Sequence, residues 1–183
     1  MVFPLSRSIP PASLAAVEKI FQLEPGAYSL FVAVTDSMTG SLLGIVERRM
    51  EIPAIPPTLH SASSLILADL IESGSGSPSD AFRLGDIRVR PNFTGKLQRG
   101  QDLKLVQQVY NPASSSLTYE TLITTSGREV KRVREDLATS PELTVIRNFP
   151  LSDLPPGSYE VETTVTDSAT GLKVGARANF SVE

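Results

Sequence analysis

A segment near the N-terminus of this chain is written a second time at its C-terminus. Leu23–Ile52 and Leu154–Glu183 match at Leu, Pro, Gly, Tyr, Val, Thr-Asp-Ser, Thr-Gly and a later Gly after a shift of 131 positions, from Leu23 to Leu154. In each copy a Pro-Gly turn precedes an alternating apolar stretch and a short loop with Asp and Gly, the pattern of two antiparallel strands and a tight turn. The repeat therefore predicts the same β-hairpin twice, and with it an all-β fold.

The two copies differ in how many faces are apolar. Tyr159–Val165 alternates inward apolar residues with outward glutamates, as a half-buried antiparallel strand does. Tyr28–Val34 alternates in the same way, but the opposite face of this copy is apolar too, at Phe31, Leu43 and Ile45. A hairpin that is apolar on both faces needs cover on both. We therefore expect Phe31, Leu43 and Ile45 to lie in a contact with the rest of the chain or with a second chain.

The segment between the copies predicts the domain organisation. Residues 53–60 (PAIPPTLH) contain three prolines and read as a stiff connector. Residues 61–183 hold about seven or eight short strand patterns at the spacing of an antiparallel immunoglobulin- or fibronectin-III-like β-sandwich. Residues 1–52 then form a partial sandwich repeat, its closing hairpin, which is docked on the complete domain or swapped between chains. Truncation from a larger protein is the third way to account for half a sandwich.

Two stretches leave the choice between helix and strand open. Residues 13–22 (SLAAVEKIFQ) allow a short helix, although their place before the repeat favours a strand over 16–22. Residues 61–71 (SASSLILADLI) have no clean period. After Gly85 the apolar positions change parity, from Phe82 and Leu84 to Ile87, which suggests a β-bulge at that glycine.

Composition excludes several classes of function. The net charge is −3, with acidic and basic residues interspersed, so there is no clustered basic field for nucleic acid. No apolar run approaches the roughly 18 residues of a membrane span. The absence of cysteine removes disulfides, thiol nucleophiles and zinc–thiolate sites. We expect no cofactor and no enzyme activity.

Few residues are candidates for chemistry. His60 is the only histidine, and it lies in the proline-rich connector, a poor place for the oriented base of a catalytic triad. Asp36 and Asp167 recur at the same place in both copies and are weak candidates for calcium, whereas an aspartate that opens a hairpin loop is the ordinary reading. Tyr28 and Tyr159, each just after Pro-Gly, predict a tyrosine corner, with the ring in the core and the hydroxyl bonded to nearby backbone.

A resemblance rests on a series of motifs from Phe21 to Glu183. The run L-x-PG-x-Y…V-x-D-x-x-TG, the ADL, GD-x-RV-x-P and LVQQVYN segments, and the second LPPGSYEV…VTD resemble the tandem β-sandwich tails of bacterial secreted proteins. These are tails of the GWxTD-domain type and of the von Willebrand A-related type common in acidobacteria. Neither the GWxTD motif nor the DxSxS metal motif occurs here, so no activity of those domains is implied. The resemblance implies an exported, periplasmic or extracellular module of a longer chain.

Two classes of function remain. The first is a non-catalytic β-sandwich module that contacts a protein partner, or associates with itself as a homodimer, through the N-terminal half-repeat. The second is a calcium- or ligand-binding accessory domain of a secreted enzyme or adhesin. The doubly apolar first copy favours the first class.

Overall fold

The chain separates into two compact units, residues 1–54 and 55–183. The computed structural model describes residues 21–55, 59–74, 82–113 and 116–183, and every regular element among these is a β-strand. The expected strand over 16–22 falls almost entirely outside the described residues. The strands are β1 (Gly26–Thr35), β2 (Leu42–Ile52), β3 (Ser61–Ala62), β4 (Ile66–Ser73), β5 (Arg83–Leu84), β6 (Ile87–Pro91), β7 (Lys96–Leu97), β8 (Asp102–Tyr110), β9 (Ser116–Thr125), β10 (Arg128–Ala138), β11 (Glu142–Pro150), β12 (Gly157–Asp167) and β13 (Lys173–Val182).

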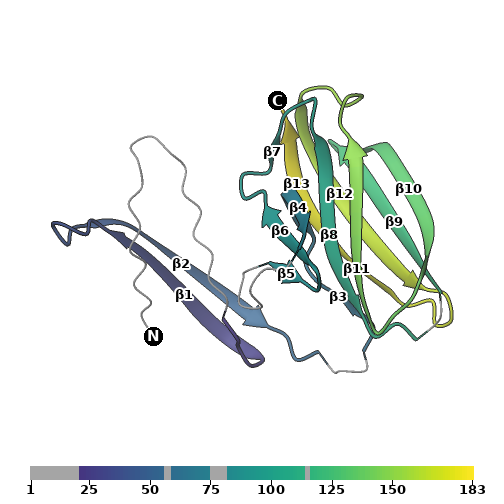
Figure 1. The fold of residues 1–183 in the computed structure, drawn as a ribbon, viewed down its shortest axis with the longest axis horizontal. Helices are drawn as coiled ribbons and strands as arrows, with labels where there is room; N and C mark the ends of the chain where they lie inside the picture. The colour runs from purple at the N-terminus through teal and green to yellow at the C-terminus, as the bar shows by residue number, and fades with distance from the viewer. Residues whose placement is uncertain (1–20, 56–58, 75–81, 114–115) are drawn as a thin grey trace. The chain divides into compact units, whose positions relative to one another are not determined.

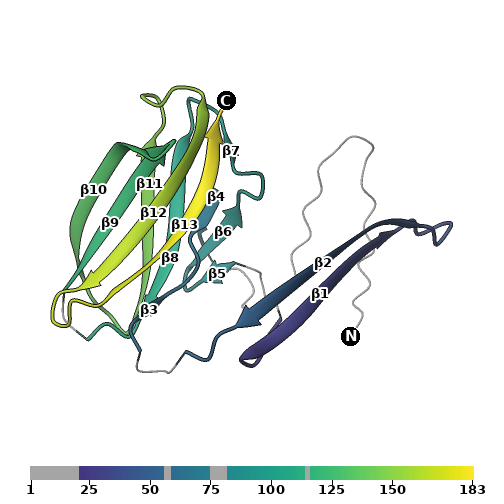
Figure 2. The same cartoon turned by 180° about the vertical axis from the view of Figure 1, so that it is seen from behind.

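The larger unit is a sandwich of two sheets (Figures 1 and 2). One sheet has the order β10-β9-β12-β13-β7, and the other has the order β11-β8-β4-β6-β5 with β3 paired to β8. All pairs are antiparallel except β13 with β7. The chain passes to the first sheet for β7 and returns for β8, then passes to it for β9 and β10, returns for β11, and ends in it with β12 and β13.

This strand order is that of an immunoglobulin-like sandwich. β4, β8 and β11 occupy the places of strands A, B and E, while β9, β12 and β13 occupy those of C, F and G. β10 is the additional strand beside C. The expected all-β antiparallel sandwich is therefore confirmed, and the repeated hairpin β12–β13 is its closing F–G pair. Whether the first hairpin docks on it or swaps between chains stays a prediction.

The core lies between the facing sheets and is mostly aliphatic. Its members are fully or almost fully buried residues of both layers, namely Leu65, Leu67, Leu97, Leu103, Leu105, Ile123, Phe149, Leu151, Leu154, Tyr159, Val161, Phe180 and Val182. Gln107 is one of the polar residues that are buried in the described part of the sandwich. Gln107 of β8 accepts hydrogen bonds from the hydroxyls of Tyr119 (3.1 Å) and Thr163 (2.9 Å) and donates to the carbonyl of Ser63 (3.1 Å). Gln107 thus links the two sheets through a buried network.

The structure resolves one ambiguity of the sequence and corrects one expectation. Residues 61–71 are strands, β3 and the first part of β4, because both run along β8. No β-bulge forms at Gly85. Leu84 pairs with Ile87, and Gly85, at φ 61°, opens a two-residue turn between β5 and β6. A tight turn reverses the chain and so produces the same change of parity that suggested a bulge.

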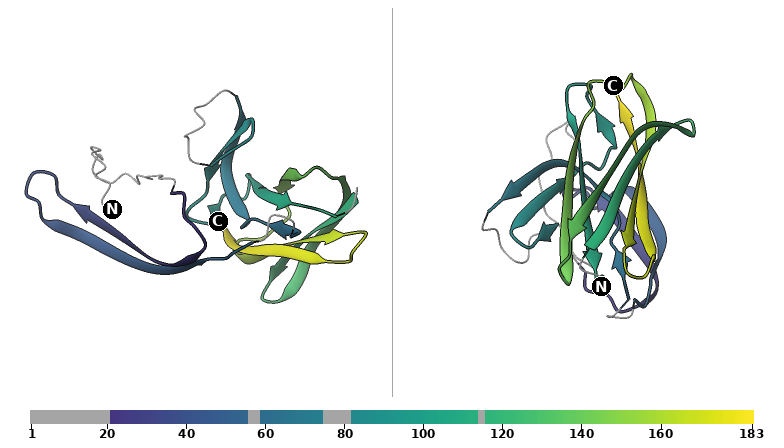
Figure 3. Two further views of the ribbon diagram at one scale, coloured as in Figure 1. Left: turned by 90° about the horizontal axis from the view of Figure 1, so that it is seen from below. Right: turned by 90° about the vertical axis from the view of Figure 1, so that its right-hand side faces the viewer.

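Among its described residues, the smaller unit forms one hairpin, β1–β2, a long two-stranded ribbon (Figure 3). Tyr28 pairs with Met50 and Val32 with Val46, so the alternating residues of β1 share one face as expected. Phe31 pairs with Glu47 on the other face. The register shifts by one place between Val34 and Thr35, because Thr35 pairs with Leu42 while Val34 pairs with Gly44. Leu43 is the extra residue, a β-bulge that β13 lacks.

Gly175 of β13 permits a close backbone approach inside the sandwich. A Cβ atom added there would lie 2.1 Å from the carbonyl oxygen of Thr163 in β12, far inside van der Waals contact. We expect Gly175→Ala to lower the free energy of unfolding by about 2–3 kcal/mol, the cost of forcing a packed backbone apart. Urea unfolding measures this loss. Gly100→Ala is the matched control, because nothing lies within 4 Å of its Cβ position. Equal stabilities of the two variants would contradict the close approach.

Candidate functional site

The repeated Pro-Gly-Tyr element forms the same corner in both copies. The Tyr159 hydroxyl, at the start of β12, donates to the carbonyl of Pro155 at 2.6 Å. The Tyr28 hydroxyl, at the start of β1, donates to the carbonyl of Glu24 at 2.7 Å. Both are tyrosine corners, which in immunoglobulin-like sandwiches mark the start of strand F. The expected bond from the hydroxyl to nearby backbone is confirmed in both copies, whereas the expected place of the ring in the core is confirmed for Tyr159 and wrong for Tyr28. β1–β2 is locally built as an F–G hairpin.

The two corners differ in what covers the tyrosine ring. Tyr159 is buried and stacks on Phe180 of β13, with ring centroids 5.3 Å apart. In the first copy the cross-strand partner is Met50, which is 42% exposed, and Tyr28 is only partly buried. The local hydrogen bond therefore forms in both copies, whereas the packing that normally accompanies it is complete only in the second.

The two recurring aspartates organise the hairpin loops. Asp167 is fully buried: its Oδ1 accepts from the backbone N–H of Ala169 (2.9 Å) and Thr170 (3.1 Å), and its Oδ2 accepts from the N–H of Ala113 (2.7 Å). Asp36 Oδ1 accepts from the N–H groups of Met38 and Thr39, both at 2.8 Å. The bonds from Thr39 and Met38 lower the pKa of Asp36 below its usual range.

These contacts are those of turn residues and not of metal ligands. Backbone N–H donors occupy Asp36 Oδ1 and both carboxylate oxygens of Asp167, and a donor at such an oxygen competes with a cation. In the part of the chain that the structure describes, no group of three or more His, Cys, Asp or Glu side chains could hold a metal ion. The geometry of these two residues is explained by their backbone N–H partners.

His60 is not the exposed connector residue that its sequence context suggests. Its side chain is buried at 6% exposure, next to the short strand β3. Among the residues that the structure describes, neither ring nitrogen has a hydrogen-bond partner. A catalytic base needs a partner that orients its ring and a nucleophile that it can deprotonate. His60 has neither contact, so its position gives no support to a catalytic triad.

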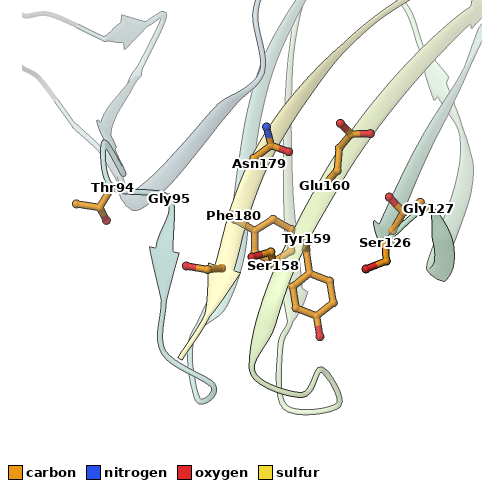
Figure 4. A pocket seen from close by; sticks show the side chains of 11 residues that line it. Thr94, Gly95, Ser126, Gly127, Ser158, Tyr159, Glu160, Asn179 and Phe180 are labelled. Atoms are coloured by element: carbon orange, nitrogen blue, oxygen red, sulfur yellow. The ribbon is translucent and has the colours of Figure 1, made fainter.

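A shallow hollow lies at one end of the sandwich (Figure 4), with a volume of about 530 Å³. Glu160 and Asn179 project into it from paired positions of β12 and β13. The hydroxyl of Tyr159 is already bonded to Pro155. The lining offers hydroxyl, amide and one carboxylate group but no paired base and nucleophile. The lining residues are Thr94, Gly95, Thr124, Ser126, Gly127, Ser158, Tyr159, Glu160, Asn179, Phe180 and Ser181.

The hairpin β1–β2 is the feature that the sandwich scaffold does not explain. Phe31, Leu43 and Ile45 are 61%, 66% and 62% exposed, and the opposite face is exposed as well, with Val32 at 48% and Val34 at 53%. In the second copy the face equivalent to Phe31 carries Glu162, which forms an ion pair with Arg177 at 3.0 Å. An apolar surface in place of a charged one is typical of a contact site. The contact itself stays a prediction.

Half a sandwich is expected to leave a bare strand edge, and among the described residues β1 has one, since its sheet contains only β2. Gly26–Thr35 (GAYSLFVAVT) contains no charged residue, whereas the edge strand β10 (REVKRVREDLA) carries seven. Charged residues are a common device that prevents edge strands from pairing with other chains. The absence of charge was visible in the sequence, but its meaning depends on β1 being an edge.

Comparisons with known proteins identify no family for this chain. No protein-family model matches the chain, and no curated protein matches it. Among solved structures, one match is the CARDB domain of a Pyrococcus furiosus protein in complex with di-metal ions, 14% identical, covering 66% of this chain and 88% of that chain with a TM-score of 0.36. Among the described residues no helix is long and apolar enough to cross a membrane.

Proposed function

We propose that this chain is a non-catalytic β-sandwich module whose hairpin β1–β2 contacts another protein surface. The observation that carries the proposal is the exposure of apolar side chains on both faces of that hairpin, with Phe31 at 61% and Val34 at 53%. A two-stranded hairpin is at best marginally stable alone in water. A partner that covers its apolar faces would remove apolar surface from water, and this burial favours association.

The first form of the contact that we propose is self-association through the outer face, at Phe31, Leu43 and Ile45. These residues lie toward the loop end of the hairpin, and Ala33, which pairs with Ile45, extends the apolar surface between them. On the β2 strand of the same face lie two charged residues, Glu47, which pairs with Phe31, and Arg49, which pairs with Ser29. An apolar centre with a charged rim is the usual composition of a protein–protein interface.

Light scattering and sedimentation of the wild-type chain and of a Phe31→Asp, Ile45→Asp double variant test this form. We expect the wild type to approach twice its chain mass of 19.7 kDa as its concentration rises, and the variant to stay at 19.7 kDa. A Val130→Asp, Leu172→Asp variant is the matched control, because it adds the same charge at exposed apolar residues of the sandwich, which are 41% and 52% exposed. A wild type that remains monomeric at all concentrations would contradict self-association.

We also propose that the module acts outside the cytoplasm as part of a longer bacterial protein. The support for this location is the resemblance of the repeated Pro-Gly-Tyr and Thr-Asp-Ser motifs to the tails of secreted proteins. Fractionation of the native cells with an antibody against the sandwich would decide it, and a purely cytoplasmic signal would contradict export.

A further inference from the structure

The second copy of the repeat shows what the first copy lacks. In the sandwich, β12 pairs with β9 along the side that faces away from β13, with Glu160 opposite Thr124 and Asp167 opposite Leu117. Among the described residues, the equivalent edge of β1 has no such strand, because the sheet of β1 contains only β2. The chain thus carries the same hairpin once with its neighbouring strand and once without it.

The free edge of β1 presents its own row of backbone groups. The Asp36 N–H donates to the carbonyl of Ser41 across the hairpin, so Asp36 and every second residue before it direct their backbone groups toward β2. The residues in between, Ser29, Phe31, Ala33 and Thr35, therefore direct N–H and C=O groups away from β2. In β12 the equivalent groups are those that meet β9.

The face beside this edge is incomplete in the same way. Leu30, Val32 and Val34 are 38%, 48% and 53% exposed. Their counterparts in β12 are Val161, Thr163 and Val165, all at 0% exposure. Both copies carry apolar or small side chains at these positions. In the first copy these side chains are exposed, although their counterparts in the second copy are buried.

The loop aspartates provide an independent indication. Asp167 Oδ2 accepts the N–H of Ala113, which belongs to the segment that leads into β9. Asp36 has the same loop contacts through Oδ1, but among the described residues no backbone N–H from outside its own loop reaches its carboxylate as Ala113 reaches Asp167. The first copy therefore retains an acceptor at the position where, in the second copy, the chain entering the neighbouring strand supplies a donor.

We propose that the free edge of β1 takes up an antiparallel β-strand from a different protein, in the register that β9 has on β12. The strand alternates bulky apolar residues, which cover Leu30, Val32 and Val34, with Ser, Thr or Glu. A backbone N–H just before it bonds to Asp36 Oδ2. The uncharged sequence of β1 places no obstacle to this pairing. The inference deepens the contact role proposed for the hairpin, but it does not require self-association, which uses the outer face.

The chain itself supplies a probe for the experiment. A peptide of residues 111–125 (NPASSSLTYETLITT) contains β9 and the Ala113 N–H. By the shift of the repeat it would place Ile123 opposite Leu30, Thr121 opposite Val32 and Tyr119 opposite Val34. We expect it to bind the whole chain with 1:1 stoichiometry in calorimetry and to protect the amides of Ser29, Phe31, Ala33 and Thr35 from hydrogen exchange. A peptide with Tyr119→Asp and Ile123→Asp should not bind.

Two proline variants make the test specific for one edge. Ala33→Pro removes a donor from the free edge of β1 and leaves the bonds to β2 intact, so peptide affinity should fall at least about tenfold. Glu47→Pro is the matched control on the free edge of β2 and should leave the affinity unchanged. Both keep the hairpin pairing, which the exchange of the β2-facing amides of Val32 and Val34 verifies.

The remaining outcomes count against the proposal. No binding, or protection at β10 or β12 in place of β1, would overturn it. Protection of the four amides without peptide would also overturn it: a rise with protein concentration would identify a second copy as the occupant, and no such rise would identify a segment of the same chain. The two proposals can fail separately. Self-association in light scattering without protection of these amides would support the outer-face contact, and the peptide experiment alone then decides whether the edge of β1 binds a strand.

Discussion

Replacing Asp167 by alanine is expected to lower the free energy of unfolding by about 3 kcal/mol or more, since buried donors left without partners cost about 1–3 kcal/mol each. The carboxylate is fully buried and accepts three backbone N–H groups, from Ala113, Ala169 and Thr170. Two of these bonds form the loop between β12 and β13. The third ties that loop to the segment before β9, 54 residues away in the sequence.

Chemical unfolding followed by circular dichroism measures the loss. Asp167→Asn separates the two parts of the interaction, because the amide keeps one acceptor for the loop but presents a donor to Ala113. We expect it to fall between wild type and Asp167→Ala. Asp153→Ala is the control, since Asp153 is exposed and its nearest polar contact is the hydroxyl of its neighbour Ser152. A loss below about 1 kcal/mol in Asp167→Ala would show that the N–H groups find other partners.

Alkaline pH is expected to remove about 2–3 kcal/mol of stability through Tyr119, at 1.36 kcal/mol for each pKa unit. Burial, the largest influence, raises the pKa of Tyr119 to about 12, although the Thr163 hydrogen bond and the charge of Arg147 act in the opposite direction. In the unfolded chain a tyrosine titrates near pH 10. The folded state therefore favours the neutral phenol, so its contribution is complete below about pH 10 and is lost as pH rises through about 12.

Urea unfolding at steps between pH 8 and pH 12 measures this dependence. Tyr119→Phe removes the ionisation and keeps the ring, so its alkaline loss should be smaller than that of the wild type, even though its stability at pH 8 is lower without the bond to Gln107. Tyr159→Phe is the matched control, because it removes another tyrosine hydroxyl of the sandwich. An alkaline loss of equal size in wild type and Tyr119→Phe would assign the effect to other groups.

Many local features were predictable from sequence alone. Ser126-Gly127 predicts a hairpin, and both residues adopt positive φ, 47° and 75°, as a two-residue turn requires. The alternation in Tyr159–Val165 predicts which side chains are buried. The two tyrosine corners and the two aspartate loops follow from the repeated motif, because the bonds of the tyrosine hydroxyls and of the aspartate Oδ1 atoms join residues only two to four positions apart.

Other features could not be read from the sequence because they depend on residues far away in it. His60 is buried although its proline-rich surroundings indicate an exposed connector. Gln107 is a polar residue in an alternating strand, and nothing near it indicates that Tyr119 and Thr163 will occupy its acceptor. Gly44 and Gly175 are equivalent in the repeat, yet only Gly175 has a backbone oxygen against its Cβ position, since the bulge at Leu43 shifts the register of the first hairpin.

The first hairpin shows most clearly the difference between local features and features that depend on distant residues. The repeated motif predicts that Leu23–Ile52 forms the same strands, corner and loop as Leu154–Glu183, because period-two alternation, glycine at positive φ and short-range hydrogen bonds are local properties. The pairing of β9 with β12 became visible in the folded structure, and so did the lack, among the described residues, of a third strand beside β1. Strand pairing joins residues many positions apart, so a strand's sequence fixes its faces but not its neighbour.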